Sequence, residues 1–512
     1  MGSLLLVLSV LLALIAVWSA LMLGLGDGKE KYAAEALGFA ALIGAVAGFV
    51  TVRVAGASGQ MGRREALLLV ALSWIVGAAL SGLPFYAWAF IVELQTGVRH
   101  AFYSPVNAYF EAMSGLTTTG ATILENIADP NEPGVVLPRS LLLWRSLTHW
   151  LGGLGIVVLF VAVLPSLGAG GKRLYKVEAP GPRAEGVTPN IRETARVLWL
   201  IYLGLTAAEI VALRISGMDW FNSFCHTFAT LATGGFSTHN ASMAGANSAA
   251  AEWIVVVFML LAGINFGLYY MLIRGRWKKA LADTELRVYL GIMAVAALLV
   301  TVAIYNRPIT TTAGEQLTGT AGEAVRYGVF QVVSIQTTTG FGTADFDRWP
   351  FIAQAVLICL MFIGGSAGST GGGLKVMRIW MMFKVLAAEV EKAFRPNVVR
   401  SMKVGTAPVD ADLRLGTIGY ILSMVLIMAV GGVALQVFES FGDSGATFRT
   451  TGTASIACLF NIGPGLGLVG ATENYAWFTD ASKLLMSLLM AIGRLELFAI
   501  IVLFSPRYWR GD

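Results

Sequence analysis

Four short glycine-containing breaks interrupt the apolar parts of this chain at nearly regular intervals. They read T-T-T-G-A-T, A-T-G-G-F-S-T, T-T-T-G-F-G-T and F-N-I-G-P-G. Alignment on one glycine each puts Gly120, Gly234, Gly340 and Gly463 in register, with spacings of 114, 106 and 123 residues. A long internal period of this kind indicates four copies of one structural unit.

The residue types in these breaks favour the binding of a small cation. A Thr-Gly stretch offers consecutive backbone carbonyls, and glycine adopts backbone angles that other residues avoid. Carbonyls from four copies around one axis can replace the hydration shell of an ion. The alternative is a set of ordinary glycine turns between membrane helices. The predicted cation ligands are Thr118, Thr119, Gly120, Thr233, Gly234, Thr338, Thr339, Gly340, Asn461, Ile462 and Gly463.

The composition places these breaks inside a membrane. Of the 512 residues, 56% are hydrophobic and 13% are charged, and the mean hydropathy is +0.70. These values exclude an ordinary soluble protein. About ten apolar runs approach the roughly 20 helical residues that cross a hydrocarbon core. We therefore predict an all-α polytopic membrane protein with four pseudo-repeats around a central pore. Cys225, Cys359 and Cys458 fit no metal or disulfide spacing, and we interpret them as buried small residues.

Each unit is predicted to contain a long apolar helix, a re-entrant half-helix that enters the break, and a second long helix. The half-helices, too short to span, are predicted at 105–116, 220–231, 322–335 and 445–458. The first long helices are predicted at 66–94, 194–215, 285–305 and 412–439. The second long helices are predicted at 137–165, 249–273, 351–390 and 475–504. Irregular backbone at membrane depth needs protein or water around it, and a central pore provides this environment.

Two more apolar segments, 4–25 and 33–54, precede the first unit. We interpret them as an accessory hairpin whose first helix is retained, with a cleaved secretory signal as the alternative. The predicted divisions are therefore an accessory N-terminal hairpin at 1–55, pore repeat 1 at 56–180, pore repeat 2 at 181–278, pore repeat 3 with a gating loop at 279–403, and pore repeat 4 at 404–512.

The distribution of charge predicts the orientation of the chain. If the breaks open outward, 24 of the 36 Lys and Arg residues fall on the inner side. Cytoplasmic loops carry such an excess of basic residues. The acidic residues are mostly assigned to the outer side, where an acidic mouth would concentrate cations before they enter.

A second glycine-rich stretch lies within the third unit and reads I-G-G-S-A-G-S-T-G-G-G-L-K. Each glycine costs a regular helix about 1 kcal/mol relative to alanine, so the chain is predicted to break here. We interpret the break as a flexible gating loop under the filter. Close helix packing through small residues is the alternative, and the spacing of a phosphate-binding loop is not met. The glycines of the predicted gate are Gly364, Gly365, Gly368, Gly371, Gly372 and Gly373.

Arg494 is a charge inside the last apolar helix. Because a charge facing lipid is costly, we expect this side chain to face the pore or a partner. It would then set an electrostatic barrier below the filter or anchor the glycine loop by binding its carbonyls; pairing with a structural acid is the alternative. For four other charges near membrane depth, structural pairing or interface positions are favoured: Glu111, Arg145, Glu209 and Lys483.

With these motifs assembled, the chain resembles the Trk/Ktr/HKT superfamily of potassium transporters, and most closely its TrkH/TrkG branch. The four breaks, the G-G-S-A-G-S-T-G-G-G-L-K loop and G-R-L-E look like the family's signatures in the family's order. The resemblance covers essentially the whole chain. The hairpin before residue 66 is a feature of the Trk branch and is absent from the shorter Ktr proteins.

The resemblance implies a potassium-uptake subunit of the bacterial inner membrane, with K⁺ as the transported ion and no organic cofactor in this chain. It implies a homodimer and a cytoplasmic, TrkA-like nucleotide-binding ring on the inner face. It also implies that the four aligned glycines belong to the filter, 364–373 to the gating loop, and Arg494 to the pore. The fourth break has Asn461 and Ile462 in place of threonines, so selectivity against Na⁺ or Rb⁺ is expected to be modest.

Two mechanisms of transport remain open at this point. The first is a channel-like pore that moves K⁺ passively or in coupling with another ion. The second is an alternating-access secondary transporter that couples K⁺ to Na⁺ or H⁺, because such proteins also use repeats and broken helices. Parallel repeats that all carry a filter favour the first. An enzyme is disfavoured, since no nucleophile, base and orienting group stand at a recognisable spacing, and a nucleic-acid partner is not expected. The dispersed histidines His100, His149, His226 and His239 are interpreted as structural.

Overall fold

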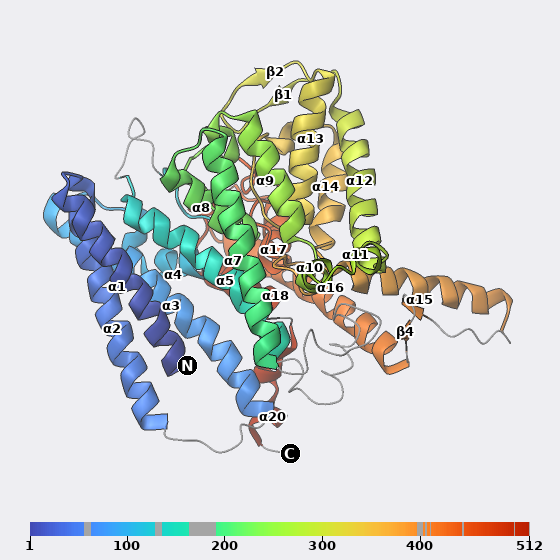
Figure 1. Cartoon of the computed structure of the whole chain (residues 1–512), viewed down its shortest axis with the longest axis horizontal. Coiled ribbons are helices and arrows are strands. Elements are labelled where there is room, and N and C mark those ends of the chain that lie inside the picture. The colour runs from blue at the N-terminus through green and yellow to red at the C-terminus, as the bar shows by residue number, and fades with distance from the viewer. Residues whose placement is uncertain are drawn as a thin grey trace.

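The computed structural model describes residues 1–55, 63–127, 136–162, 191–396, 403–404, 407–409, 411–442, 445–495 and 497–510. Helices dominate this part of the chain, as Figure 1 shows. Six of the described helices are long and apolar enough to cross a membrane, and one bent pair makes a seventh if it is counted as a single span. The chain is therefore a multi-pass, all-α membrane protein, as the sequence predicted.

The N-terminal hairpin consists of α1 (Gly2–Gly24) and α2 (Lys31–Ala55), joined by a short 3₁₀ turn, η1 (Gly28–Glu30). The two helices lie side by side at one edge of the molecule, next to α3 (Arg63–Thr96) (Figure 1). Glu30 is fully buried and accepts hydrogen bonds from Ser19 Oγ (2.7 Å) and from the backbone N of Ser140 (3.1 Å). Because Ser140 lies in the first turn of α5 (Arg139–Ala162), this carboxylate fastens the hairpin to the first unit.

Four half-helices point into the centre of the molecule. They are α4 (Pro105–Leu116), α8 (Trp220–Leu231), α13 (Ala321–Gln336) and α17 (Phe448–Leu459). Each begins where a short polar side chain accepts a hydrogen bond from the third backbone N–H beyond it, a strong helix-start signal. The capping residues are Ser104, Asp219, Thr320 and Thr447. The first two half-helices have the predicted bounds, and the other two differ from prediction by one to three residues.

The first long helix of each unit is continuous. Besides α3, these helices are α7 (Ile191–Ile215), α12 (Thr284–Ile304) and α16 (Ala411–Glu439). Two small antiparallel ribbons lie in the connections. Strand β1 (Ile309–Thr310) pairs with β2 (Gln316–Leu317), and β3 (Lys403–Val404) pairs with β4 (Ala407–Pro408).

Two of the second long helices are broken, one where the sequence predicted a single helix and one at the predicted glycine break. In the second unit, α9 (Ala249–Ala262) and α10 (Phe266–Ile273) meet at 92° instead of forming one helix over 249–273. Asn265 causes a new start here, since its side chain accepts a hydrogen bond from Gly267 N (2.8 Å). In the third unit, α14 (Phe351–Phe362) and α15 (Val376–Phe394) flank the predicted glycine break.

The second helix of the fourth unit is also shorter than predicted. Instead of running over 475–504, α18 (Asp480–Arg494) begins at a Thr479 cap and ends at Arg494. Leu497, with a left-handed φ of 59°, then prevents a regular continuation. Short helical turns follow at α19 (Phe498–Ile501), η6 (Val502–Phe504) and α20 (Pro506–Arg510).

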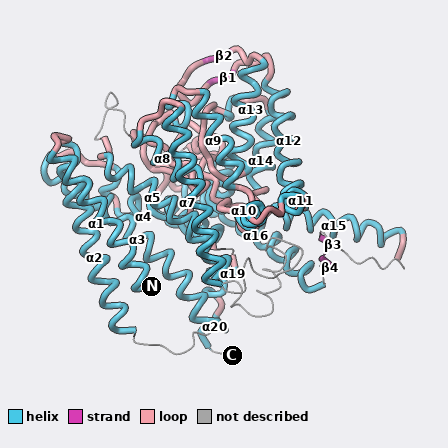
Figure 2. The backbone as a smooth tube through the Cα atoms, viewed as in Figure 1, coloured by secondary structure: helices cyan, strands magenta, loops and turns pink. Residues whose placement is uncertain are grey.

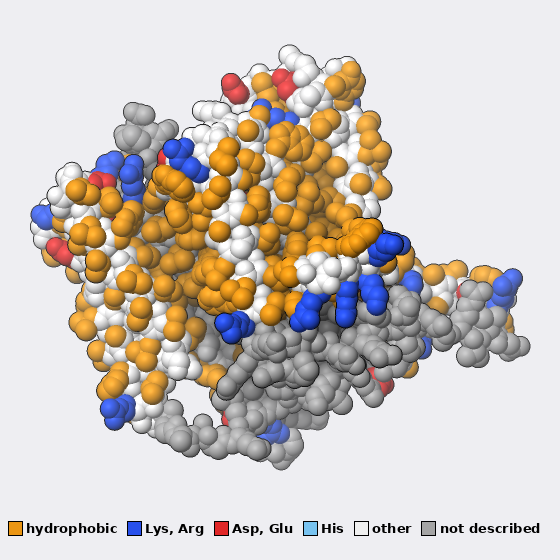
Figure 3. Space-filling view, viewed as in Figure 1, with side chains coloured by type: hydrophobic (Ala, Val, Ile, Leu, Met, Phe, Trp, Pro, Cys, Tyr) orange, Lys and Arg blue, Asp and Glu red, His pale blue; other side chains and the backbone are white. Residues whose placement is uncertain are grey.

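The arrangement leaves non-helical backbone in the middle of the molecule and apolar side chains on its flank. Figure 2 shows loop segments running through the interior of the helical body. On the face shown in Figure 3, a broad apolar surface is bordered along its lower edge by Lys and Arg side chains. An apolar belt with a basic edge is typical of a protein that spans a bilayer.

Candidate functional site

The four half-helices end in turns with the same backbone geometry. In each turn, one backbone N–H donates to the carbonyl five residues earlier, at 2.8–2.9 Å. The donors are Thr119, Gly234, Thr339 and Ile462. The residue before each donor is left-handed, with φ between 53° and 59°: Thr118, Thr233, Thr338 and Asn461. The residue after each donor is a left-handed glycine with φ between 79° and 97°: Gly120, Gly235, Gly340 and Gly463.

This geometry corrects the sequence alignment of the second break. The equivalent of Gly120, Gly340 and Gly463 is Gly235, and Gly234 instead occupies the position of the preceding residue. The T-G-G sequence offers two glycines, and the pattern alone selected the wrong one. The corrected spacings are 115, 105 and 123 residues.

The buried side chain of His149 explains why a second glycine stands at position 234. A Cβ built on Gly234 would overlap the imidazole ring. That ring is held on both sides, because Nδ1 bonds to Gly115 O (2.7 Å) and Nε2 accepts from Phe236 N (3.3 Å). Since Nε2 accepts, Nδ1 carries the proton. His149 thus occupies the space of a side chain at this position and braces the second turn against α4.

The four turns contact one another in a closed cycle. A Cβ built on Gly120 would overlap Gly234 O, one on Gly235 would overlap Thr339 O, and one on Gly340 would overlap Ile462 O. A Cβ on Gly463 would lie 2.7 Å from Thr119 O, which returns the cycle to the first turn. Real Cβ atoms do not approach carbonyl oxygens this closely, so each glycine is required by the neighbouring turn. Chain order and order around the ring are the same.

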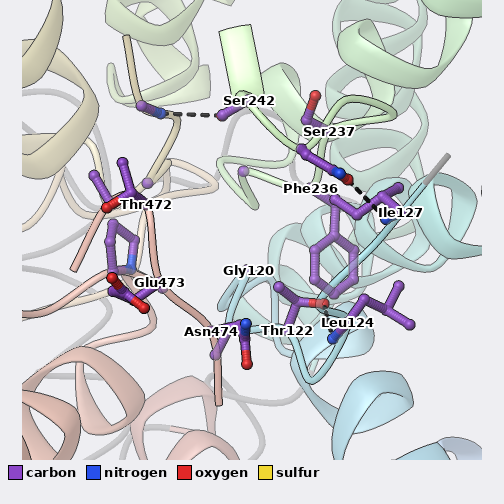
Figure 4. A pocket seen from close by; sticks show the side chains of 18 of the residues that line it. Gly120, Thr122, Leu124, Ile127, Phe236, Ser237, Ser242, Thr472, Glu473 and Asn474 are labelled. Atoms are coloured by element: carbon purple, nitrogen blue, oxygen red, sulfur yellow. Dashed lines mark hydrogen bonds between the residues drawn. The ribbon is translucent and has the colours of Figure 1, made fainter. Parts of the chain in front are cut away.

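A cavity of about 140 Å³ opens on one side of this ring and is lined by all four left-handed glycines. Figure 4 shows Glu473 and Asn474 on one side of it and Thr122 and Phe236 on the other. Glu125 also lines the wall. Tyr475 lies beside them and donates its hydroxyl to Gly463 O (2.7 Å), which ties the fourth turn to the cavity wall.

A buried ion pair supports the first and second turns from behind. Arg145 Nε lies 2.7 Å from Glu111 Oε1, and both side chains are buried. Glu111 also accepts from Ile123 N (3.0 Å), just beyond the first turn. The guanidinium of Arg145 donates to Ser237 O (3.0 Å) and lies 3.4 Å from the centre of the Phe236 ring, just beyond the second turn. The predicted structural pairing of Glu111 and Arg145 is therefore confirmed.

The other two membrane-depth charges, Lys483 and Glu209, differ in their surroundings. Lys483 donates to Asn107 Oδ1 and to Ala476 O, both at 2.8 Å. The first of these bonds connects α18 to the start of α4. Glu209 of α7 is fully buried near Thr230 of α8, but neither of its carboxylate oxygens forms a hydrogen bond or an ion pair with a described residue, so a structural pairing is not confirmed for it.

The glycine-rich loop lies against the ring on the side opposite the cavity. In this loop, the backbone N of Gly372 donates to Thr338 Oγ1 in the third turn (2.7 Å). A Cβ on Gly372 would lie 2.6 Å from Phe460 O at the fourth turn. The hydroxyl of Thr370 donates to Leu231 O at the end of α8 (2.8 Å). Residues 364–373 thus touch three of the four turns at once.

Other units hold the loop in this place. Ser366 N donates to Gly263 O (2.9 Å) at the α9–α10 break. Ala367 N donates to the carboxylate of Glu285 in α12 (2.8 Å). These partners come from different segments of the sequence, so the loop's conformation depends on the whole assembly.

Arg494 binds carbonyl oxygens, one of the two roles expected for a pore-facing arginine. Its guanidinium donates to Thr370 O in the loop (2.8 Å) and to Gly152 O in α5 (3.1 Å), and the side chain is buried. Within the described residues it forms no ion pair, so the structural-acid alternative finds no support there. Arg494 therefore connects the loop to the first and fourth units.

Sequence reasoning missed several residues that shape this site. Gly235 was hidden by the adjacent glycine, although the position of the helix end indicates its register. His149 and Glu285 lie in helices far from the breaks in sequence, and Tyr475 follows a loop with no distinctive pattern. Only the tertiary contacts identify these three.

Comparisons with known proteins agree with this architecture. The family model TrkH, described as "Cation transport protein", matches residues 84–510. The Trk system potassium uptake protein TrkH of Escherichia coli (strain K12) is 38% identical over 454 residues, covering 88% of this chain and 87% of that protein. TrkG of the same strain is 31% identical with the same coverage. The crystal structure of the potassium transporter TrkH from Vibrio parahaemolyticus superposes with a TM-score of 0.80 at 31% identity, covering 99% of both chains. This chain therefore belongs to the TrkH family of cation transport proteins.

Proposed function

We propose that this chain takes up K⁺ across the bacterial inner membrane through a channel-like pore whose selectivity filter is the ring of four turns. The observation that carries the proposal is the closed cycle in which each left-handed glycine packs against a carbonyl of the next turn. Relatives that match most of the chain are named potassium uptake proteins. A ring of carbonyls suits K⁺ because it replaces the hydration shell without a charged side chain.

The K⁺ ligands in this proposal are backbone carbonyls from three successive positions of each turn. They are the predicted residues together with Gly235: Thr118, Thr119, Gly120, Thr233, Gly234, Gly235, Thr338, Thr339, Gly340, Asn461, Ile462 and Gly463. The second and fourth turns lack the T-T-G sequence of the others. Because their surroundings differ, we expect the ring to be less uniform than a four-fold symmetric filter and its selectivity over Na⁺ to be modest.

The loop at residues 364–373 and Arg494 form the gate of the proposed pore. The loop contacts three turns on the side away from the cavity, and Arg494 fastens it to α5. A path along the ring axis would meet this loop, so the conformation described corresponds to a closed gate. A switch needs only a bias of a few kcal/mol between two loop positions.

The proposed partners are those that the resemblance to the Trk family implies. We propose that the protein is a homodimer and that its inner face binds a cytoplasmic, TrkA-like nucleotide-binding ring. The proposed divisions are the hairpin at 1–55 and pore repeats at 56–180, 181–278, 279–403 and 404–512. Helix α15 starts directly after the loop, so a partner that moves α15 would move the gate.

A second mechanism is alternating access with K⁺ coupled to Na⁺ or H⁺. The 92° break between α9 and α10 favours it, because secondary transporters use discontinuous helices near the midplane. The cyclic contact of all four turns favours the pore. The contacts join all four units around one axis, whereas alternating access needs two parts of the molecule that move against each other.

Flux measurements on proteoliposomes separate the two mechanisms. With a membrane potential imposed and no Na⁺ or H⁺ gradient, the pore predicts entry of K⁺ and Rb⁺ that follows the potential, with slower entry of Na⁺. Uptake that stops unless a Na⁺ or H⁺ gradient is supplied would establish the coupled mechanism instead. Protein-free vesicles measure the leak.

A further inference from the structure

A short segment at the lower edge of the apolar surface is used by no step proposed above. Helix α10 turns 92° from α9 and so runs across the direction of that span. Gly275, with a φ of 72°, turns the chain again before α11 (Trp277–Leu281). Figures 1 and 3 place α10 and α11 at the lower edge of the apolar surface. We call residues 272–281 the rim segment.

The rim segment mixes exposed apolar and exposed basic side chains. Ile273, Trp277 and Leu281 are 73%, 55% and 57% exposed. The segment contains no acidic residue, and its four basic residues are all exposed: Arg274, Arg276, Lys278 and Lys279. None of the four forms an ion pair with another described residue. This combination is typical of segments that lie in the headgroup region of a bilayer.

Both ends of the rim segment lead directly to residues that hold the loop. Before it, Phe266 N, the first residue of α10, donates to Gly368 O (3.1 Å). After it, Glu285 in the first turn of α12 accepts from Ala367 N (2.8 Å). A displacement of the rim segment therefore pulls on hydrogen bonds to two neighbouring loop residues.

We propose that the rim segment binds the anionic headgroups of phospholipids in the adjoining leaflet, and that this binding holds the loop in the position seen here. The four basic residues contact the headgroup phosphates, while Ile273, Trp277 and Leu281 enter the acyl boundary. The effect on the loop rests on the function proposed above; the binding of lipid does not.

The apolar residues favour lipid over an acidic protein partner. They continue the lipid-facing surface of α12, on which Leu290 and Leu298 are also exposed. A partner that neutralised only the charges would leave the rim segment's apolar side chains in water. A leaflet that contains anionic lipid meets both needs.

The test uses the full-length protein without any partner. Native mass spectrometry compares binding of phosphatidylglycerol with binding of phosphatidylcholine. The variant replaces all four rim residues with glutamine (R274Q, R276Q, K278Q, K279Q). The matched control removes four exposed basic residues from the other end of the molecule (K29Q, K31Q, R99Q, R214Q). If the quadruple variant is not monodisperse, the pairs R274Q/R276Q and K278Q/K279Q replace it.

We expect the parent and the control to prefer phosphatidylglycerol, and the rim variant to lose that preference. About 1 kcal/mol per basic residue corresponds to roughly fivefold weaker binding for each charge removed. Equal binding of the two lipids by the parent overturns the proposal. A preference for phosphatidylglycerol that survives in the rim variant also overturns it. If that variant keeps the lipid preference and loses only its response to a cytoplasmic partner, the rim segment binds that partner and not lipid.

The coupling to the loop has a separate readout. In vesicles with phosphatidylglycerol, ring-independent K⁺ flux through the rim variant should exceed that of the parent at least about twofold, and the difference should vanish in phosphatidylcholine. Lost lipid preference with unchanged flux overturns the coupling. Mass spectrometry measures lipid binding without transport. The lipid result therefore stays interpretable even if the proposed pore function is wrong.

Discussion

The four glycine turns and the loop beneath them are both buried and rich in glycine, yet they are held in different ways. Each turn repeats the same hydrogen bond to its own half-helix, four times in one molecule. The loop is bonded mainly to other elements, including α8, α12 and the α9–α10 break. The turns are therefore specified locally, whereas the loop's position depends on how the units are packed.

This difference assigns different dynamics to the two regions. A turn fixed by its own helix, with a neighbouring carbonyl against its glycine, has little freedom to change. In the proposed gate, the loop exchanges its partners when the units shift, because these partners belong to several different elements. In the proposed pore, the four turns act as a fixed filter above a loop that moves.

The largest effect is expected from a side chain placed in the ring. Gly340→Ser adds a Cβ that overlaps Ile462 O at a φ of 79°. A non-glycine residue in this region costs about 1–2 kcal/mol before any clash is counted. We expect at least about a tenfold fall in the K⁺ to Na⁺ permeability ratio, equivalent to ~1.4 kcal/mol.

The matched control for this change is Gly291→Ser in α12, where a Cβ meets nothing within 4 Å. It should leave the ratio unchanged in the same reversal-potential measurement. Equal losses for the two variants would mean that the ring does not select the ion.

The next largest effect is expected from shortening the loop. Deletion of 367–371 removes the bonds to Glu285, Leu231 and Arg494. Flux should rise severalfold and no longer respond to the nucleotide of the cytoplasmic ring. A monodisperse deletion protein that conducts no faster than the parent and still responds to nucleotide would place the gate elsewhere.

Two variants of Arg494 distinguish its two proposed roles, a tether of the loop and an electrostatic barrier to cations. Arg494→Ala removes both the charge and the two bonds to Thr370 O and Gly152 O. Arg494→Lys keeps the charge but cannot reproduce the forked donor geometry. If the tether matters, both variants should conduct faster than the parent. If only the alanine variant does, the charge is the barrier.

The smallest effect is expected from Tyr475→Phe. It removes one hydroxyl bond to Gly463 O and leaves the internal bond of the fourth turn intact. A single hydrogen bond contributes about 1 kcal/mol, so selectivity should change less than about fivefold. A loss as large as that of Gly340→Ser would show that the turns depend on outside support, contrary to the comparison above.

The sequence predicted those parts of the structure that local chemistry determines. The half-helices begin at capping residues such as Ser104 and Asp219 and end at glycine turns, and the first two matched to the residue. The G-G-S-A-G-S-T-G-G-G break was also found where it was expected. The all-helical membrane class followed from composition.

Features that depend on packing were not predictable in this way. The need for a glycine at position 234 comes from His149, which fills the space that a side chain there would occupy. The 92° bend at Asn265 lies in a run that reads as one apolar helix. The loop's attachments to Glu285 and Arg494 join residues about 80 and 120 positions away along the chain.

The central claim is that K⁺ passes through the ring of four turns. The most direct test is the anomalous diffraction of Rb⁺ or Tl⁺ in crystals of the protein, together with Rb⁺ flux through the same preparation. The account predicts peaks on the ring axis, between the carbonyl oxygens of Thr119, Gly234, Thr339 and Ile462. A preparation that transports Rb⁺ but binds it only away from this ring would contradict the account.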